Sequence, residues 1–181
     1  GISNFSAEQT EEALRYGPIH SSQPRYSMLF REVEEEVLPT CLANGIGVIP
    51  YSVLAKGLLG GRYRPGQEFP LDDERHYWPH FQGESFERTF QVTQRLKAWA
   101  ADHGRDIVQL AIAWPLAHPA VTSSIVGAKS PEQVRHNAQA ADWKLTPNEL
   151  AEIDEVQGDL TLSFIWPTRS PPVSPSPPHD P

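Results

Sequence analysis

The sequence predicts an α/β fold built on a parallel sheet, and two observations support that prediction. Strand-like and helix-like segments alternate along most of the 181 residues. The apolar run IGVIPY at residues 46–51 indicates a strand covered on both faces, which is typical of parallel sheets. With 39% hydrophobic residues, the chain is large enough for one sizeable core, so we expect a single globular domain.

The expected strands lie at residues 2–5, 19–23, 46–51 and 121–126. The first of them, ISNF, is apolar for only two residues before a helix start, so we expect it to be the end of a strand whose beginning is missing. Ser6 with Gln9 has the form of a capping box, which is why a helix is expected directly behind it.

The expected helices lie at residues 7–14, 31–44, 85–103, 107–117, 131–141 and 147–156. Ser130-Pro131 and Thr146-Pro147 are typical starts of the last two, because a capping hydroxyl precedes a proline that needs no helical donor. Pro115 lies near the end of the fourth and is expected to kink that helix or end it early.

Two segments have no regular periodicity. Residues 57–84 are rich in Gly, Pro and aromatic residues and are too long for a plain connector, so we expect a lid or binding loop. Residues 167–181 contain seven prolines and are expected to form a disordered tail behind a domain of residues 1–166.

Composition excludes several classes of protein. The net charge of −8, with 15 scattered basic residues, argues against a nucleic-acid partner. The lone Cys41 excludes a disulfide framework, and no apolar run is long enough for a membrane span, so we expect a cytoplasmic protein without a membrane partner. The histidines lack ligand spacing, so no metal is expected.

Polar residues follow each expected strand, whereas no GxGxxG motif does. Ser3-Asn4, Gln23, Tyr51-Ser52 and Lys129-Ser130 stand at these strand ends. The (β/α)8 barrels keep their sites at the carboxyl ends of the strands, so this pattern favours a barrel over a doubly wound sheet.

Four motifs resemble the aldo-keto reductase family in order and spacing: GISNF, QPRYSML, IGVIPYSVLAKGLLGGRY and SSIVGAKSPEQVRHN. The resemblance covers roughly residues 1–156 and matches the family's fifth to eighth strand ends. It implies the C-terminal half of a (β/α)8 TIM barrel, with parallel strands and outer helices, that binds NADP(H) and acts on small carbonyl compounds.

The resemblance also implies a set of cofactor-binding residues. Ser3, Asn4 and Gln23 match residues that hold the nicotinamide carboxamide, and Tyr51 matches the aromatic that stacks on the nicotinamide ring. The remaining matches, on the phosphate and adenine side, are Ser52, Leu54, Arg62, Gly127, Lys129, Ser130, Gln133 and Asn137.

Physical chemistry agrees with this assignment in part. Amide and hydroxyl side chains offer both the donors and the acceptors that a carboxamide needs. The start of the helix behind Ser130 offers free backbone NH groups and a positive dipole end, and Lys129 adds charge, which favours NADP over NAD. His136 departs from the family, where many relatives carry Glu toward the adenine.

The family's catalytic Asp, Tyr, Lys and His belong to earlier strands, and the resemblance assigns no catalytic residue to this chain. Three readings follow: a C-terminal half of an NADP-dependent reductase that is inactive alone, a self-associating half-barrel that binds a nucleotide, or a non-catalytic structural remnant. Open sheet edges make a homo-oligomer, or pairing with a missing N-terminal half, the expected assembly. The identity of the carbonyl substrate is left open.

Overall fold

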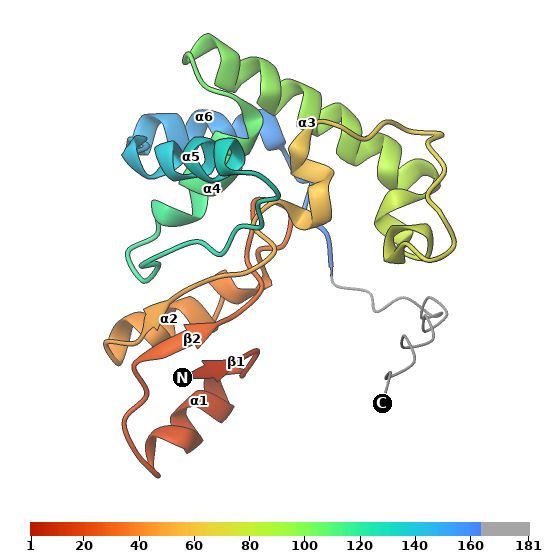
Figure 1. Cartoon of the computed structure of the whole chain (residues 1–181). Coiled ribbons are helices and arrows are strands. Elements are labelled where there is room, and N and C mark those ends of the chain that lie inside the picture. The colour runs from red at the N-terminus through yellow and green to blue at the C-terminus, as the bar shows by residue number, and fades with distance from the viewer. Residues whose placement is uncertain (164–181) are drawn as a thin grey trace, which may run out of the picture.

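The computed structural model describes residues 1–163 and shows strands alternating with helices (Figure 1). The strands are β1 (Ile2–Ser3), β2 (Ser21–Gln23) and β3 (Gly47–Val48). The α-helices are α1 (Ala7–Leu14), α2 (Val37–Ala43), α3 (Gly83–Asp102), α4 (Ile107–Leu116), α5 (Pro131–Ala138) and α6 (Pro147–Gln157). Short 3-10 helices are η1 (Glu32–Glu34), η2 (Ala55–Gly60), η3 (Glu74–His76), η4 (Pro79–Phe81) and η5 (Gln139–Asp142).

The sheet is parallel and its strands follow the chain order β1-β2-β3. Ile2 pairs with Ser22, and Ser21 pairs with Gly47. This confirms the α/β class with parallel strands. The strands are shorter than the sequence predicts, although an isolated parallel bridge between Arg25 and Tyr51 continues the pairing beyond β2 and β3.

The expected strand at residues 121–126 is wrong. Val121 forms only an isolated parallel bridge with Val48, and the chain then follows β3 through backbone bonds from Thr122 to Val48 and from Ile125 to Pro50. Thr122, Ser123 and Ile125 are exposed, so this segment has no buried face that would hold it as a regular strand. It still lies next to β3, where a fourth strand was expected.

The expected helix at residues 31–44 is divided into η1 and α2. Pro39 explains the division, because it has no NH to donate and its ring collides with the backbone four residues earlier, so it is tolerated only in a first turn. Accordingly α2 begins at Val37 and places Pro39 in its first turn. The expected helix at residues 131–141 is likewise divided, into α5 and η5.

The predicted helix caps are confirmed. Both halves of the capping box form at Ser6 with Gln9 and at Thr146 with Glu149. Ser130 caps α5 by accepting a hydrogen bond from the Gln133 backbone at 3.3 Å. Helix α4 ends at Leu116, one residue after Pro115, as that proline predicts.

Most of the core is one cluster shared by the turn after β2, the lid and the helices. Figure 1 shows α3 to α6 gathered at one end of the molecule and β1, β2, α1 and α2 at the other. Helix α3 packs on α6 and α4, and α1 packs on α2. The long loop of residues 57–84 is not irregular throughout, since η2, η3 and η4 form within it or at its start and it buries Phe69, Trp78 and Phe81.

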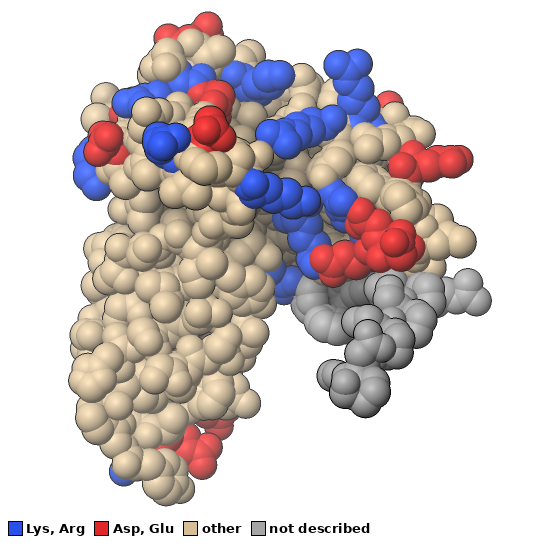
Figure 2. Space-filling model, in the orientation of Figure 1, with Lys and Arg blue, Asp and Glu red and all other residues tan. Residues whose placement is uncertain are grey.

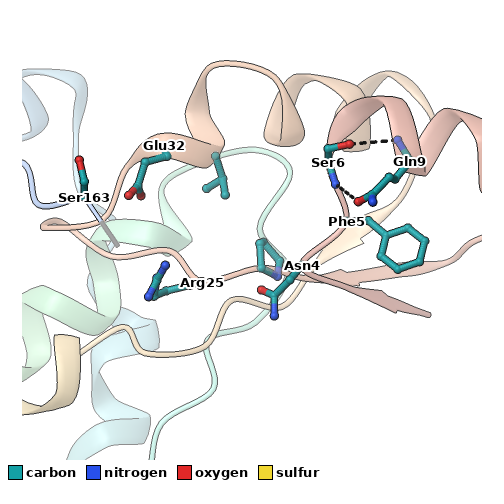
Figure 3. A pocket seen from close by; sticks show the side chains of 9 residues that line it. Asn4, Phe5, Ser6, Gln9, Arg25, Glu32 and Ser163 are labelled. Carbon is teal, nitrogen blue, oxygen red and sulfur yellow. Dashed lines mark hydrogen bonds between the residues drawn. The ribbon is translucent and has the colours of Figure 1, made fainter. Parts of the chain in front are cut away.

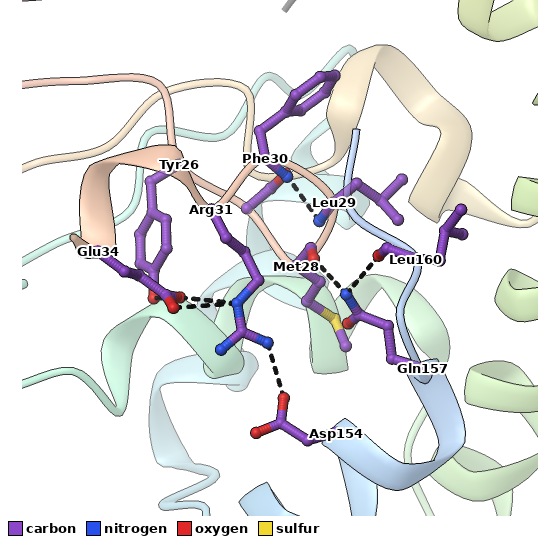
Figure 4. Close-up of polar contacts among 10 residues, drawn as sticks. Tyr26, Met28, Leu29, Phe30, Arg31, Glu34, Asp154, Gln157 and Leu160 are labelled. Carbon is purple, nitrogen blue, oxygen red and sulfur yellow. Dashed lines mark hydrogen bonds and ion pairs between the residues drawn. The ribbon is translucent and has the colours of Figure 1, made fainter. Parts of the chain in front are cut away.

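Helix α6 is tied to the turn that follows β2 (Figure 4). Gln157 is 2% exposed, and its Nε2 donates to the backbone oxygens of Met28 at 2.6 Å and Leu160 at 2.9 Å. The Leu162 backbone donates to Leu29 at 2.7 Å. Arg31 adds a 2.7 Å ion pair to Asp154 of α6. The carboxyl end of β2 is therefore anchored on the last helix described.

The expected boundary at residue 166 and the proline-rich segment 167–181 lie outside the described residues. Across residues 1–163, no helix is both long and apolar enough to cross a membrane.

We predict that Gln157→Leu lowers the free energy of unfolding by about 2 kcal/mol, because it leaves two buried carbonyl oxygens without their donor. Urea denaturation followed by tryptophan fluorescence measures the change. The matched control is Gln91→Leu at an exposed position of α3, which should change stability by less than about 0.5 kcal/mol. Equal effects of the two substitutions would show that the Gln157 contacts do not stabilise the fold.

Candidate functional site

Four of the predicted site residues meet at the carboxyl ends of the three strands. The Ser3 hydroxyl donates to the Gln23 backbone oxygen at 2.9 Å, which joins the ends of β1 and β2. The Tyr51 hydroxyl donates to Asn4 Oδ1 at 3.2 Å, which joins β1 to the segment after β3. These two bonds hold the four residues at one edge of the sheet.

The backbone at this edge adopts conformations that most residues avoid. Asn4 and Ser52 both have φ of 57°, in the left-handed region. Asn tolerates this region better than most side chains. In the loop after β3, Ala55 and Lys56 also have positive φ, of 47° and 55°. Such clusters of unfavourable backbone are common at ligand-binding sites, where the surrounding packing holds them in place.

The loop of residues 52–62 is held against the segment that leads to Gly127. Val53 is buried with Ile112 and Ala140 in a small second core cluster, and Leu54 and Val126 pack against it. Two predicted binding regions, the loop after β3 and the start of α5, are thereby fixed beside each other. Arg62 is exposed at the far end of this loop.

Lys56, in the same loop, is engaged by residues of the lid. Its Nζ lies 2.6 Å from Glu74 and 4.6 Å from the centre of the Trp78 ring. These contacts tie the loop after β3 to the lid. They make Lys56 a less suitable phosphate ligand than Arg62.

The start of α5 is organised by its own side chains. Gln133 Oε1 accepts a hydrogen bond from the Lys129 backbone at 2.6 Å, and Asn137 Nδ2 donates to the Gly127 oxygen at 3.4 Å. The side chain of Lys129 is exposed. His136 lies 2.6 Å from Asp106, the cap of α4. Gln133 and Asn137 thus shape the loop of residues 127–129, and His136 joins α5 to α4.

A cavity of about 490 Å³ opens beside the Asn4 end of this group (Figure 3). Asn4, Ser6, Gln9, Arg25 and Glu32 are among the residues that line it. Its volume suits a small organic ligand. Sequence reasoning missed Arg25, although the alternation of half-buried and buried residues along 21–26 puts its side chain on the same face as that of Gln23.

The Tyr26 side chain is engaged within the fold. The Tyr26 hydroxyl is buried and donates to Glu34 at 2.8 Å, and burial raises the pKa of Tyr26 far above its ordinary value. No hydrogen bond within residues 1–163 joins a tyrosine hydroxyl to a lysine. In the same residues, no group of three His, Cys, Asp or Glu side chains is placed to hold a metal ion.

Charge is unevenly distributed on the face shown in Figure 2. Lys and Arg side chains gather over the part that holds α3 to α6, while the part that holds β1, β2, α1 and α2 shows few charges. Asp and Glu side chains lie among these Lys and Arg side chains, so this part carries charges of both signs.

Comparison with known proteins finds relatives of this chain. The model of the aldo/keto reductase family matches residues 1–157. The aldo-keto reductase YhdN of Bacillus subtilis (strain 168) is 32% identical over 157 residues, which are 86% of this chain and 47% of that protein.

Solved structures agree with the sequence match. The glycerol dehydrogenase AKR11B4 from Gluconobacter oxydans superposes with a TM-score of 0.83 at 30% identity, over 93% of this chain and 51% of that one. The aldo-keto reductase AKR11C1 from Bacillus halodurans, in its holo form, gives a TM-score of 0.66 at 25% identity, over 90% and 51%. The chain spans about half the length of the relatives it matches.

His80, in the lid near Arg25, generates a prediction about pH. It is 4% exposed, its Nε2 lies 3.0 Å from the Ser163 backbone oxygen, and burial lowers its pKa, with Arg25 lowering it further. Because the pKa of His80 is lower in the folded protein than in the unfolded chain, His80 takes up a proton when the protein unfolds in acid. The contribution of neutral His80 to the free energy of unfolding should therefore be fully present above about pH 6.5 and decrease as the pH falls below this value.

Urea denaturation at pH 7.5 and pH 5.5 tests this expectation. His80→Gln should reduce the loss of stability between the two values, whereas His20→Gln, at an exposed position, should leave it unchanged. His118, whose pKa burial also lowers, should account for part of the remaining loss. An unchanged pH dependence in His80→Gln would contradict the prediction.

Proposed function

The chain belongs to the aldo/keto reductase family, and we propose that it forms the cofactor-binding half of a (β/α)8 barrel that uses NADP(H) to reduce aldehydes and ketones. The observation that carries this proposal is the hydrogen-bonded group at the three strand ends, where Ser3 contacts Gln23 and Tyr51 contacts Asn4. Parallel barrels bind their ligands at this end of the strands.

The proposed half-barrel consists of the family's units five to eight. Three observations support it: the strands are parallel and follow chain order, the segment after Val121 continues beside β3, and the chain spans about half the length of its relatives. In the family's barrel these units supply the side that binds the cofactor.

The donor set at the strand ends fits a nicotinamide. Asn4 and Gln23 have amide groups that can pair with the carboxamide, and the Tyr51 ring is half-buried beside them, where it can cover one ring face. The Tyr51 hydroxyl fixes the Asn4 oxygen, so the Asn4 NH₂ group is the end left to donate. Bound NADP(H) would supply the hydride, and these residues would hold its ring in place.

The start of α5 fits the phosphate of the adenosine ribose. The first backbone NH groups of α5, behind Ser130 and Pro131, have no hydrogen-bond acceptor within the helix and can donate to a phosphate. The exposed Lys129 adds a positive charge directly before them. Arg62 in the loop after β3 is the proposed partner of the pyrophosphate. The contacts of Gln133 and Asn137 to the loop of residues 127–129 give this half of the site its shape.

Reduction also requires an acid that protonates the carbonyl oxygen as hydride arrives. Tyr26 is unsuited to this role because it is buried and bonded to Glu34. We therefore expect the catalytic acid to come from outside these 181 residues. The proposed partners are a small carbonyl substrate and a further polypeptide, either a second copy or an N-terminal half, since within the described residues β1 pairs only with β2.

Lys129→Ala tests the cofactor assignment. Only NADPH carries the additional ribose phosphate, so we expect about a fivefold to tenfold weaker NADPH affinity and little change for NADH. Fluorescence titration of the purified chain measures both affinities. Lys144→Ala removes another exposed lysine and should change neither affinity. An equal loss for both cofactors would overturn the phosphate assignment.

The purified 181-residue chain should show no turnover of 4-nitrobenzaldehyde with NADPH. General acid catalysis alone contributes about 10²- to 10⁴-fold, and we expect the acid to come from outside these 181 residues. Loss of NADPH absorbance measures the rate, and sedimentation of the same sample reports its oligomeric state. Clear turnover, abolished by a substitution at Tyr51 or Asn4, would show that this chain contains a complete active site.

A further inference from the structure

We propose that two contacts from η3 position Arg62 for the pyrophosphate of NADP(H). The first contact joins Glu74 to Lys56. The second contact joins Arg75 to Tyr63. These four are positioning residues, which act through Arg62 rather than by touching the cofactor. The inference rests on the proposed function, because it takes Arg62 as the partner of the pyrophosphate.

The first contact is an ion pair supported by an aromatic ring. Lys56 Nζ lies 2.6 Å from Glu74 Oε1 and 4.6 Å from the centre of the Trp78 ring. Trp78 is 4% exposed, so the ring that faces the ammonium group is itself held by the packing of the lid. The Lys56 side chain is 26% exposed, and water and salt therefore screen this pair less than a fully exposed one.

The backbone at Lys56 has a conformation that requires support from its surroundings. Ala55 and Lys56 have φ of 47° and 55°, in the left-handed region that is unfavourable for residues with a side chain. Gly57 follows with φ of 99°, so that η2 is interrupted by a kink at these positions. Such a backbone persists only where other contacts hold it, and the bond to Glu74 is one that Lys56 makes itself.

The second contact lies on the other side of Arg62, at the next residue of the chain. The Tyr63 hydroxyl accepts a hydrogen bond from Arg75, whose Cζ lies 4.8 Å from the centre of the Tyr63 ring. The same ring packs on Gly57, where a Cβ would lie only 2.6 Å from its Cε2 atom. Two consecutive residues of η3 thus hold the segment of residues 56–63 at both ends.

Arg62 is the cation of this segment that stays available to a ligand. Its side chain is exposed, and it forms no ion pair with another residue of the described range 1–163. Lys56 and Arg75, in contrast, are each paired with an acidic side chain of the lid. A cation on a backbone that is already fixed loses less conformational freedom when it binds an anion, which favours affinity.

Trypsin digestion of the 181-residue chain without nucleotide tests whether η3 holds this segment. Trypsin cleaves after Arg62, and Glu74→Gln leaves the sequence around that bond unchanged. We expect Glu74→Gln to accelerate this cleavage about threefold, as measured by mass spectrometry, because a partly exposed ion pair contributes modestly to local order. Glu68→Gln, at another exposed carboxylate of the lid, should leave the rate unchanged.

Fluorescence titration with NADPH tests the role in binding. We expect Glu74→Gln to weaken NADPH affinity about threefold, and exchange of the two charges, in Lys56→Glu with Glu74→Lys, to restore most of that loss. Tyr63→Phe, which removes the hydrogen bond of the second contact, should also weaken affinity. In an Arg62→Ala chain, Glu74→Gln should cause no further loss, because the contact acts through Arg62. A purely structural role of Glu74 would produce the same loss with and without Arg62.

An unchanged cleavage rate in Glu74→Gln, or an equal loss of NADPH affinity with and without Arg62, would overturn the proposal. Should the exchanged pair fail to fold, as thermal unfolding would reveal, Glu74→Gln and its combination with Arg62→Ala decide the matter. NADPH binding without coupling between these two positions removes only the role of η3. Absence of NADPH binding by the wild-type chain removes the proposed function, and the role of Arg62 with it.

Discussion

The site depends on the bond between the last described helix and the turn after β2. Gln157 donates to Met28 and Leu160, and Leu162 donates to Leu29, so that α6 and its continuation close over residues 27–30. This turn leads directly out of the segment that carries Gln23 and Arg25. Because a buried carbonyl without a donor is costly, the turn has one favourable position, and the face presented by β2 is fixed by contacts about 130 residues distant in sequence.

Much of the fold follows from local chemistry. The capping boxes at Ser6 and Thr146 and the Ser130-Pro131 start locate helices from sequence alone, because each cap is complete within four residues. The expected strand after Val121 was wrong for a physical reason. A strand exists only where a neighbour pairs with it, and beyond Val121 this segment meets β3 through scattered backbone bonds rather than a ladder.

The candidate site could likewise be predicted only in part. The residues at the strand ends could be predicted, because parallel strands place their carboxyl ends at one edge and family motifs mark them. The contacts of Arg25 and Lys56 could not be predicted. The position of the Arg25 guanidinium depends on the Phe30 ring, and that of the Lys56 ammonium depends on Glu74 and Trp78, which belong to the lid. Sequence identifies a charged residue, while its available partners depend on tertiary packing.

Binding and proton transfer are physically separable in this chain. The groups proposed to hold the cofactor are amides, a hydroxyl, an aromatic ring and exposed cations, none of which must change protonation state to act. A catalytic acid, in contrast, must have a pKa near the working pH, whereas the buried Tyr26 has its pKa raised by burial and by Glu34. Tyr26 instead stabilises the fold, since the Glu34 carboxylate that accepts its hydrogen bond also pairs with Arg31, which in turn pairs with Asp154 of α6. The same packing that holds the end of β2 in place thus makes Tyr26 unsuitable as a catalytic acid.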